Sequence, residues 1–207
     1  MITDDLQHIL QLQKDLWRWP KSRSSVMIGA GFSLNSQALP GVTSRFPTWN
    51  QLVNRMFDEL YPIQAGMTDT EKKNRKERFQ SENYLRLASK YEAAFGYARL
   101  DKLIRDMNPD NDHLPGTLHK KLLELPWNDV FTTNYDTLLE RTEASERTYQ
   151  TVSNAAELPG TLSPRIFKLH GSFSRTERLV IAEEHYRTYP KDSAPLVNSV
   201  QQSLLEN

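Results

Sequence analysis

The stretch VMIGAGFS, Val26–Ser33, decides the fold predicted for this 207-residue chain. An apolar run ends in Gly-Ala-Gly, and the residues that follow can open a helix. A strand, a tight turn and a helix N-terminus are how many folds hold a diphosphate, because glycines let backbone amides approach phosphate oxygens. A sharp turn with nothing bound is the other interpretation, since Leu34 stands where the dinucleotide fingerprint has Gly or Ala.

The composition limits the class of protein. Lys and Arg number 26 and Asp and Glu also 26, so the net charge does not point to nucleic acid or a membrane surface. The chain has no cysteine, which excludes disulfides and zinc sites built on thiolates. Acidic residues near the N-terminus do not fit a signal peptide, and no apolar run approaches the roughly 20 residues that span a bilayer. We therefore predict a cytoplasmic protein without a membrane segment.

Helical periodicity dominates the first half of the chain. Two capping pairs, Thr48 with Gln51 and Thr68 with Glu71, mark helix starts. No strand signal interrupts the residues between Thr68 and Met107. The spacing of apolar residues predicts helices over 3–17, 49–60, 68–107 and 194–207, and a short helix between the glycine turn and Pro40.

Strand signals surround this helical stretch. A further helix is expected to begin at Asp136, a good N-cap residue. Strands separated by helices favour a parallel sheet, so we predict an α/β fold, a Rossmann-like, doubly wound and mostly parallel sheet. The strand candidates lie at 24–28, in NDVFTTNYD (128–136), RTYQTV (147–152) and RIFKLHG (165–171), and in RLVIA (178–182).

The domain organisation follows from this order of elements. We predict one domain, 1–207, with a core formed by 24–53 and 111–190 and a helical insert at 54–110. A final helix in a doubly wound fold should lead into another strand, so we expect a chain truncated at its C-terminus.

Three predicted strands end in unusual residues, and ligands bind at the carboxyl ends of parallel strands. The first ending is Gly29–Ser33, where Ser33 adds a hydroxyl. The second contains Asn134, the only amide in its run, and Asp136, for which a helix cap is the alternative role. The third ends in His170, whose imidazole can accept a proton near neutral pH. Each ending alone fits a structural role, whereas three in one crevice would form a site.

The combination of these motifs resembles the sirtuin-like family, and more narrowly the NAD+-cleaving domains of bacterial anti-phage defence proteins. Gly-Ala-Gly-x-Ser, Thr-x-Asn-x-Asp and Leu-His-Gly occur in this order, and FPTWNQLV (46–53) resembles a helix start common in that branch. The resemblance runs from about residue 24 to about 190. The matching residues are Gly29, Ala30, Gly31, Phe32 and Ser33; Thr132, Thr133, Asn134, Tyr135 and Asp136; and Lys168, Leu169, His170 and Gly171.

The resemblance implies an NAD+ glycohydrolase that releases nicotinamide and ADP-ribose, the effector of an abortive-infection system. NAD+ would be the substrate, with no true cofactor and no metal. Asn134 would orient the ribose and the attacking water, and His170 would be the general base. The NAD+-binding residues would be Gly29, Ala30, Gly31, Phe32, Ser33, Thr133 and Asp136, with Asp136 on the nicotinamide carboxamide.

Departures from the family pattern matter as well. Deacylases of the family carry a four-cysteine zinc module, which a chain without cysteine cannot build; the helical insert occupies that place. The run Gly-Ile-Pro-Asp-Phe-Arg is also missing. The resemblance further implies a homo-oligomer and a sensor or NTPase module, on a longer chain or a partner. A domain separated from its sensor would be either silent or unregulated.

Three other functions compete with NAD+ hydrolysis. A protein deacylase or ADP-ribosyltransferase would use the same NAD+ site. A non-catalytic module that binds NAD+ or a derived nucleotide would share the glycine loop but would not need both Asn134 and His170, so the presence of both argues against it. The basic run KKNRKER (72–78) would offer phosphate contacts, yet acidic neighbours favour a solvated helix face, and we predict no direct nucleic-acid binding.

Overall fold

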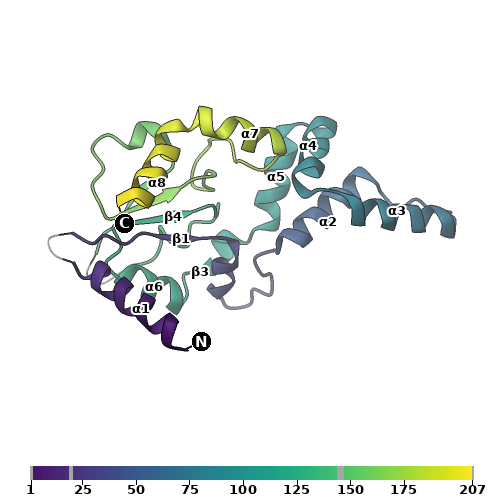
Figure 1. Ribbon diagram of the computed structural model, residues 1–207. Coiled ribbons are helices and arrows are strands. Elements are labelled where there is room, and N and C mark those ends of the chain that lie inside the picture. The colour runs from purple at the N-terminus through teal and green to yellow at the C-terminus, as the bar shows by residue number, and fades with distance from the viewer. Residues whose placement is uncertain (1, 19–20, 144–146, 207) are drawn as a thin grey trace.

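The computed structural model describes residues 2–18, 21–143 and 147–206. At its centre lies a four-stranded parallel sheet with the strand order β1-β4-β6-β5 (Figure 1). The predicted α/β class with a parallel sheet is therefore confirmed. The strands are β1 (Val26–Ile28), β4 (Asp129–Thr132), β5 (Gln150–Val152) and β6 (Arg165–Lys168).

The register of the sheet brings three strand ends level with one another. Ile28 of β1 pairs with Thr132 of β4, and Thr132 pairs with Lys168 of β6. Because the strands are parallel, the segments after these residues leave the sheet at the same edge. The three motifs singled out in the sequence thus start side by side.

Helices cover both faces of the sheet (Figure 1). Strand residues alternate between faces. Val130 and Ile166 pack against Leu16, the last residue of α1 (Ile2–Leu16), and against α6 (Thr117–Glu124), whereas Phe131 and Phe167 pack under α7 (Glu183–Asp192) and α8 (Ala194–Glu206). The first cluster contains Leu16, Leu123, Trp127, Val130, Leu139 and Ile166, and the second contains Phe131, Val152, Phe167, Leu169 and Leu196.

A separate group of helices lies beyond the carboxyl edge of the sheet (Figure 1). Both predicted capping boxes form, at Thr48 and at Thr68. The stretch expected to be helical from 68 to 107 consists of three helices, and the second break falls at Gly96, whose φ of 84° suits glycine. The helices are α2 (Trp49–Leu60), α3 (Asp69–Ser81), α4 (Tyr84–Phe95) and α5 (Tyr97–Met107). Their core includes Val53, Met56, Phe57, Leu87, Tyr91, Leu100 and Ile104.

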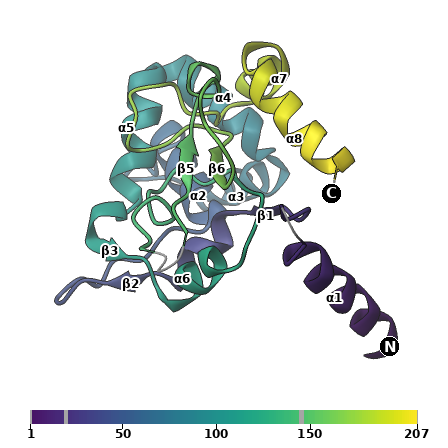
Figure 2. The same ribbon diagram turned by 90° about the vertical axis from the view of Figure 1, so that its left-hand side faces the viewer.

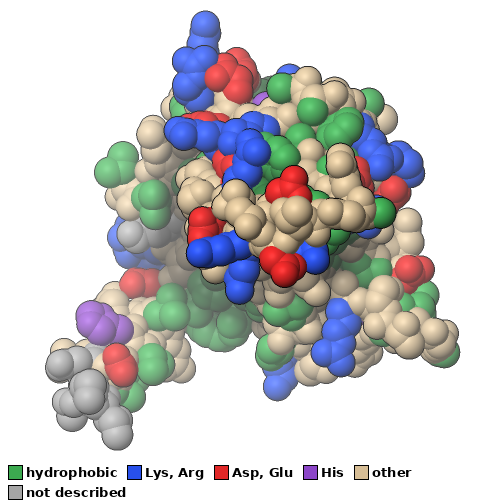
Figure 3. Space-filling model, turned by 90° about the vertical axis from the view of Figure 1, so that its right-hand side faces the viewer, with side chains coloured by type: hydrophobic (Ala, Val, Ile, Leu, Met, Phe, Trp, Pro, Cys, Tyr) green, Lys and Arg blue, Asp and Glu red, His purple; other side chains and the backbone are tan. Residues whose placement is uncertain are grey.

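Helix α3 carries the basic run and projects away from the sheet (Figure 1). None of its residues is buried. Lys72 Nζ lies 3.4 Å from Asp69 Oδ1, and Lys73 Nζ lies 3.9 Å from Glu77 Oε1. On the face shown in Figure 3, Lys and Arg side chains lie among Asp and Glu side chains. This mixture of charges is typical of a solvated helix face.

The remaining elements are short. Two-residue strands β2 (Gln37–Ala38) and β3 (His113–Leu114) pair antiparallel. Helix α1 extends away from the rest of the protein (Figure 2). In the part of the chain that the structure describes, no helix combines the length and the apolar character needed to cross a membrane. The 3₁₀-helices are η1 (Ala30–Asn35), η2 (Asp110–Asp112) and η3 (Ala155–Glu157).

Two predicted elements are wrong. Residues 178–182 form no strand: Leu179 and Ile181 are fully buried among the helices of α2 to α5, so their alternation serves that contact. Asp136 starts a turn rather than a helix. Asp110 accepts hydrogen bonds from the Thr137 amide (2.9 Å) and from Arg141 (3.1 Å), which hold the segment against η2.

The expected helix after the glycine turn is also different. Only the six-residue 3₁₀-helix η1 forms there, and it ends at Asn35 before β2. Such a short helix sums few peptide dipoles, so its contribution to anion binding is smaller than an α-helix would give. The boundaries 24–53, 54–110 and 111–190 stay a prediction.

Candidate functional site

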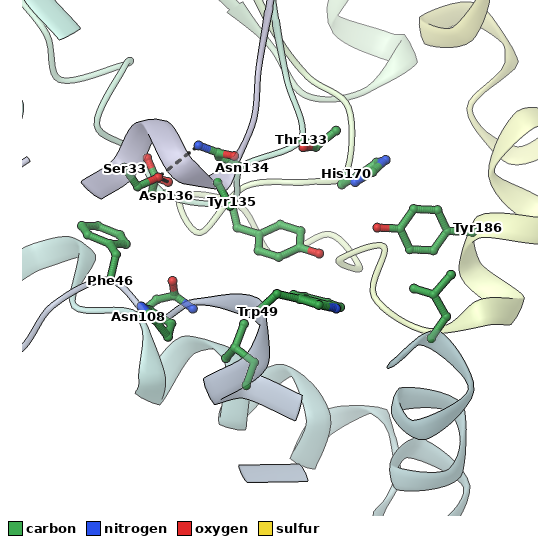
Figure 4. A pocket seen from close by; sticks show the side chains of 14 residues that line it. Ser33, Phe46, Trp49, Asn108, Thr133, Asn134, Tyr135, Asp136, His170 and Tyr186 are labelled. Carbon is green, nitrogen blue, oxygen red and sulfur yellow. Dashed lines mark hydrogen bonds between the residues drawn. The ribbon is translucent and has the colours of Figure 1, made fainter. Parts of the chain in front are cut away.

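The carboxyl ends of β1, β4 and β6 open into one cavity of about 320 Å³. This volume lies in the range of roughly 300–1,000 Å³ that is common for small-molecule sites. The strand-end residues lie on one side of the cavity, and Phe46, Trp49 and Asn108 lie opposite (Figure 4). The lining residues are Ala30, Ser33, Phe46, Pro47, Trp49, Leu52, Leu85, Asn108, Thr133, Asn134, Tyr135, Asp136, His170 and Tyr186.

A buried hydrogen-bond network joins the first two motifs. The Ser33 hydroxyl donates to Asp136 Oδ2 at 2.6 Å, and Asn134 Nδ2 donates to Ser33 Oγ at 3.0 Å. Asn134 Nδ2 also donates to the Gly29 carbonyl at 3.1 Å. Residues about one hundred positions apart in the chain are thereby fixed relative to one another.

The orientation of the Asn134 amide follows from these contacts. The Gly29 carbonyl can only accept a hydrogen bond, so the NH₂ group must face it and Oδ1 must point elsewhere. Asn134 is 8% exposed, and within the described residues its Oδ1 has no hydrogen-bond partner. Because a buried acceptor without a partner is costly, this oxygen is suited to accept a hydrogen bond from a bound molecule.

Asp136 has a structural contact as well as a place in the cavity. Its Oδ1 accepts the Leu138 amide at 3.2 Å, which stabilises the turn after β4, while its Oδ2 accepts from Ser33. Both carboxylate oxygens are thus engaged with the protein.

His170 lies in an aromatic environment on the third strand end. The rings of Tyr186 and Tyr189 meet it edge-on, with centroids 5.0 and 5.6 Å away. Burial lowers the pKa of His170 to about 4, so the imidazole is neutral at pH 7 and available as a proton acceptor. The loop that follows is tied to it, because the Val180 amide donates to the His170 carbonyl at 3.0 Å and Tyr135 donates to the Val180 carbonyl at 2.7 Å.

The glycine loop is only partly directed into the cavity. Ala30 and Ser33 line it, whereas Phe32 packs against His119 on the opposite side, with ring centroids 4.8 Å apart. A Cβ added to Gly29 or Gly31 would meet no atom within 4 Å, and neither glycine has a positive φ. Packing and backbone conformation therefore do not require glycine here, which leaves room for a ligand to approach the backbone.

Several lining residues were not among the predicted site residues. Trp49 occupies the first turn of α2, and only the FPTW motif gave a signal for it. Tyr186 comes from α7 and Asn108 follows α5, where no strand end marks them. Trp49 and Tyr186 form an aromatic wall of the cavity together with Phe46; Phe46 and Trp49 lie opposite the strand ends, and Tyr186 lies beside His170 (Figure 4).

The charges around the cavity are also informative. No Lys or Arg is among its described lining residues. Within residues 2–18, 21–143 and 147–206, no group of three His, Asp or Glu side chains is arranged to hold a metal ion. Any anionic ligand would therefore be held here by amides and hydroxyls.

Comparison with known proteins connects this geometry with a family. Residues 128–207 match the SIR2-like domain family, and this segment contains Asn134, Asp136 and His170. Over 183 residues, 86% of the chain, the sequence is 26% identical to defence-associated sirtuin 2 of Bacillus subtilis, of which it covers 16%. Over 109 residues, 51% of the chain, it is 28% identical to the NAD(+) hydrolase ThsA of Acinetobacter baumannii (strain 532279), of which it covers 22%.

These matches confirm the resemblance to sirtuin-like domains of bacterial defence proteins. The mixed α/β fold with its parallel sheet is consistent with a Rossmann-like SIR2-type fold. The chain spans about one sixth and about one fifth of the length of the two relatives.

Proposed function

We propose that this domain hydrolyses NAD+ to nicotinamide and ADP-ribose, as the effector of a bacterial anti-phage abortive-infection system. The observation that carries the proposal is the buried, unpartnered Oδ1 of Asn134 in a cavity that His170 also lines. A relative that matches about half of this chain is named an NAD(+) hydrolase, and this name supports the same reaction here.

The polar strand ends have separate roles in this proposal. Asn134 Oδ1 accepts a hydrogen bond from a ribose hydroxyl or from the attacking water. The neutral imidazole of His170 takes a proton from one of these groups as general base. The loop Gly29–Ser33 and Thr133 contact the diphosphate and ribose, and Asp136 faces the nicotinamide carboxamide. Phe32 does not line the cavity; it supports the loop by packing its ring against His119.

The reaction itself needs little acid catalysis. The bond between ribose C1′ and the pyridinium nitrogen breaks, and its electron pair neutralises the nicotinamide ring. A water oxygen forms the new bond to C1′, and the proton it loses passes through His170 to solvent. The transition state resembles the oxocarbenium ion of glycoside hydrolysis, so positioning and water control supply most of the rate. The aromatic wall of Phe46, Trp49 and Tyr186 offers the flat, cationic ring a matching surface.

Assembly and regulation belong to the same proposal. Leu6, Ile9, Leu10 and Trp17 are all exposed on or just after α1, which supports a homo-oligomer formed through this helix. The mass of the purified chain in solution tests this point. A sensor or NTPase module that controls the activity, and a cytoplasmic location, complete the proposal.

The test is incubation of the purified chain with NAD+ and chromatography for nicotinamide and ADP-ribose. His170→Ala is compared with His113→Ala, a buried histidine outside the cavity. We expect release by the wild type and by His113→Ala, and a loss of roughly 10²–10⁴-fold in His170→Ala. An acetyl-lysine peptide added in parallel detects a deacylase.

Each result bears on a different candidate. Turnover that requires the peptide would replace the hydrolase with a deacylase. Tight NAD+ binding without release of nicotinamide would favour a binding module. Equal turnover in both histidine variants would remove His170 from the mechanism.

A further inference from the structure

Lys168 is a buried cation that the proposed chemistry does not use. It is the last residue of β6 and is 1% exposed. Its Nζ lies 3.1 Å from Glu140 Oε1 and donates to the main-chain carbonyl of Asp136. Because a buried charge is costly unless it is paired and hydrogen-bonded, both contacts are needed for Lys168 to occupy this position.

Glu140 completes the arrangement from the turn after β4. Its Oε1 also accepts a hydrogen bond from Ser172 Oγ at 3.4 Å. Burial raises the pKa of Glu140, and the Lys168 cation partly offsets this shift. The pair therefore links the ends of β4 and β6 on the cavity side of the sheet.

The carbonyl that Lys168 holds belongs to the loop that carries the candidate catalytic amide. From Asp136 the contacts continue through Ser33 to Asn134, at 2.6 and 3.0 Å. On its own strand Lys168 precedes His170 by two residues. The side chain of Lys168 thus contacts the loop that carries Asn134, and the backbone of Lys168 continues to His170.

We propose that Lys168 and Glu140 form a buried positioning pair that fixes the loop of Asn134 relative to His170. This inference rests on the proposed function, because it assigns the pair an effect on turnover. A displacement of about 1 Å in a catalytic group can cost about 10²-fold in rate, so loss of this clamp lowers kcat more than it raises KM.

The protein contains a matched ion pair at the opposite end of the same two strands. Arg165, the first residue of β6, donates to Asp129, the first residue of β4, at 2.8 and 3.0 Å. Asp129 is 2% exposed. Breaking this pair also leaves a buried charge without its partner, but it does so at the edge away from the cavity.

The experiment compares Lys168→Met, Arg165→Met and the double variant Lys168→Met/Glu140→Leu in the same chain. The double variant removes both charges, and uncharged side chains of similar volume are often tolerated in place of a buried ion pair. Melting temperature, kcat and KM for NAD+ are measured, together with hydrogen–deuterium exchange of the peptide covering 133–138.

A positioning role predicts a specific combination of results. Lys168→Met and Arg165→Met both melt earlier, but only Lys168→Met loses at least about tenfold in kcat and gains at least about tenfold in exchange over 133–138. The double variant regains thermal stability while its kcat stays low, because the Asp136 carbonyl still lacks its donor. Recovery of kcat together with stability, or equal effects of the two single variants, would overturn the inference.

Failure of the proposed function would be visible separately. A wild type that releases no nicotinamide contradicts the hydrolase assignment. In that case the exchange of 133–138 still decides whether Lys168 fixes this loop, with unchanged exchange in both Lys168 variants as the contradicting result.

Discussion

Strand β4 has a buried asparagine near each of its ends, Asn128 before it and Asn134 after it, and the two side chains resemble each other closely. Both are 8% exposed, and in both the Oδ1 atom has no hydrogen-bond partner within the described residues. Each donates its NH₂ group to the protein, Asn128 to Asp129 at 3.0 Å and Asn134 to Gly29 at 3.1 Å. An unpartnered amide oxygen is therefore not sufficient to identify a site.

The surroundings of the two amides are what differ. Asn128 lines a cavity of about 340 Å³ at the amino edge of the sheet, with Arg18, Lys21 and Arg147 among its described lining residues. Its described lining residues include no histidine. Asn134 shares its cavity with His170 and Ser33, which come from two other strand ends. Convergence of side chains from several carboxyl ends, rather than burial of one polar group, marks the chemistry.

The largest test of this comparison is to remove each amide in turn. We expect Asn134→Ala to lower kcat for NAD+ by roughly 10²–10⁴-fold, as for loss of another positioned catalytic group. Asn128→Ala should keep turnover within about threefold. Both variants lose buried hydrogen bonds, so each should lose about 1–3 kcal/mol of stability in urea unfolding. A similar loss of kcat in both variants would mean that turnover follows stability and not position.

The strand ends could be found from the sequence because they depend on local pattern. An apolar run followed by Gly29, by Asn134 or by His170 is readable without a partner strand, and parallel order then places the three endings together. The capping boxes at Thr48 and Thr68 are local for the same reason, since donor and acceptor lie three residues apart.

The wrong predictions for 178–182 and for Asp136 both involve contacts between distant segments. Leu179 and Ile181 alternate like a strand, but the surface they fit is the helical group of α2 to α5. The segment after Asp136 is held against the distant η2 by Asp110, which accepts hydrogen bonds from the Thr137 amide and the Arg141 side chain. Tyr186 in the aromatic wall could not be predicted for the same reason, because it reaches the cavity from helix α7, which has no strand-end motif.

A change of pH tests the role of His170 at the carboxyl edge, and its expected effect on turnover is smaller than that of removing Asn134. The pKa of His170 is lowered to about 4 by burial. Since kcat/KM reports the free enzyme, its acid limb should fall near pH 4 instead of near the ordinary imidazole value of about 6.5. A limb that falls near pH 6.5, while the protein is still folded, would contradict His170 as the buried base.

The same shift has a consequence for stability. Between pH 6.5 and 4 the unfolded chain binds a proton at His170 that the folded chain does not, so stability falls as the pH is lowered through this window. From pH 7 to 5 the loss attributable to His170 is about 2 kcal/mol. Urea unfolding of the wild type and of His170→Gln at both pH values measures it, and an identical pH dependence of the two would show that His170 does not titrate in this way.

The smallest change adds a single methyl group at the carboxyl edge. Gly31→Ala meets no atom within 4 Å and needs no positive φ, so the folded protein accommodates it. Stability should stay the same or rise by up to about 1 kcal/mol, because the unfolded chain loses freedom. If the loop holds the diphosphate, the methyl group enters the space of the ligand, and KM for NAD+ should rise severalfold with little change in kcat.

Gly171→Ala is the contrasting variant for this measurement. Its φ is +95°, and an added Cβ would come within 3.0 Å of Leu179 Cδ2, so it should lower stability where Gly31→Ala does not. An unchanged KM in Gly31→Ala would show that GAGFS is a turn without a phosphate. The carboxyl edge would then owe its function to Asn134 and His170 alone, and the difference between the two edges would rest on those two side chains.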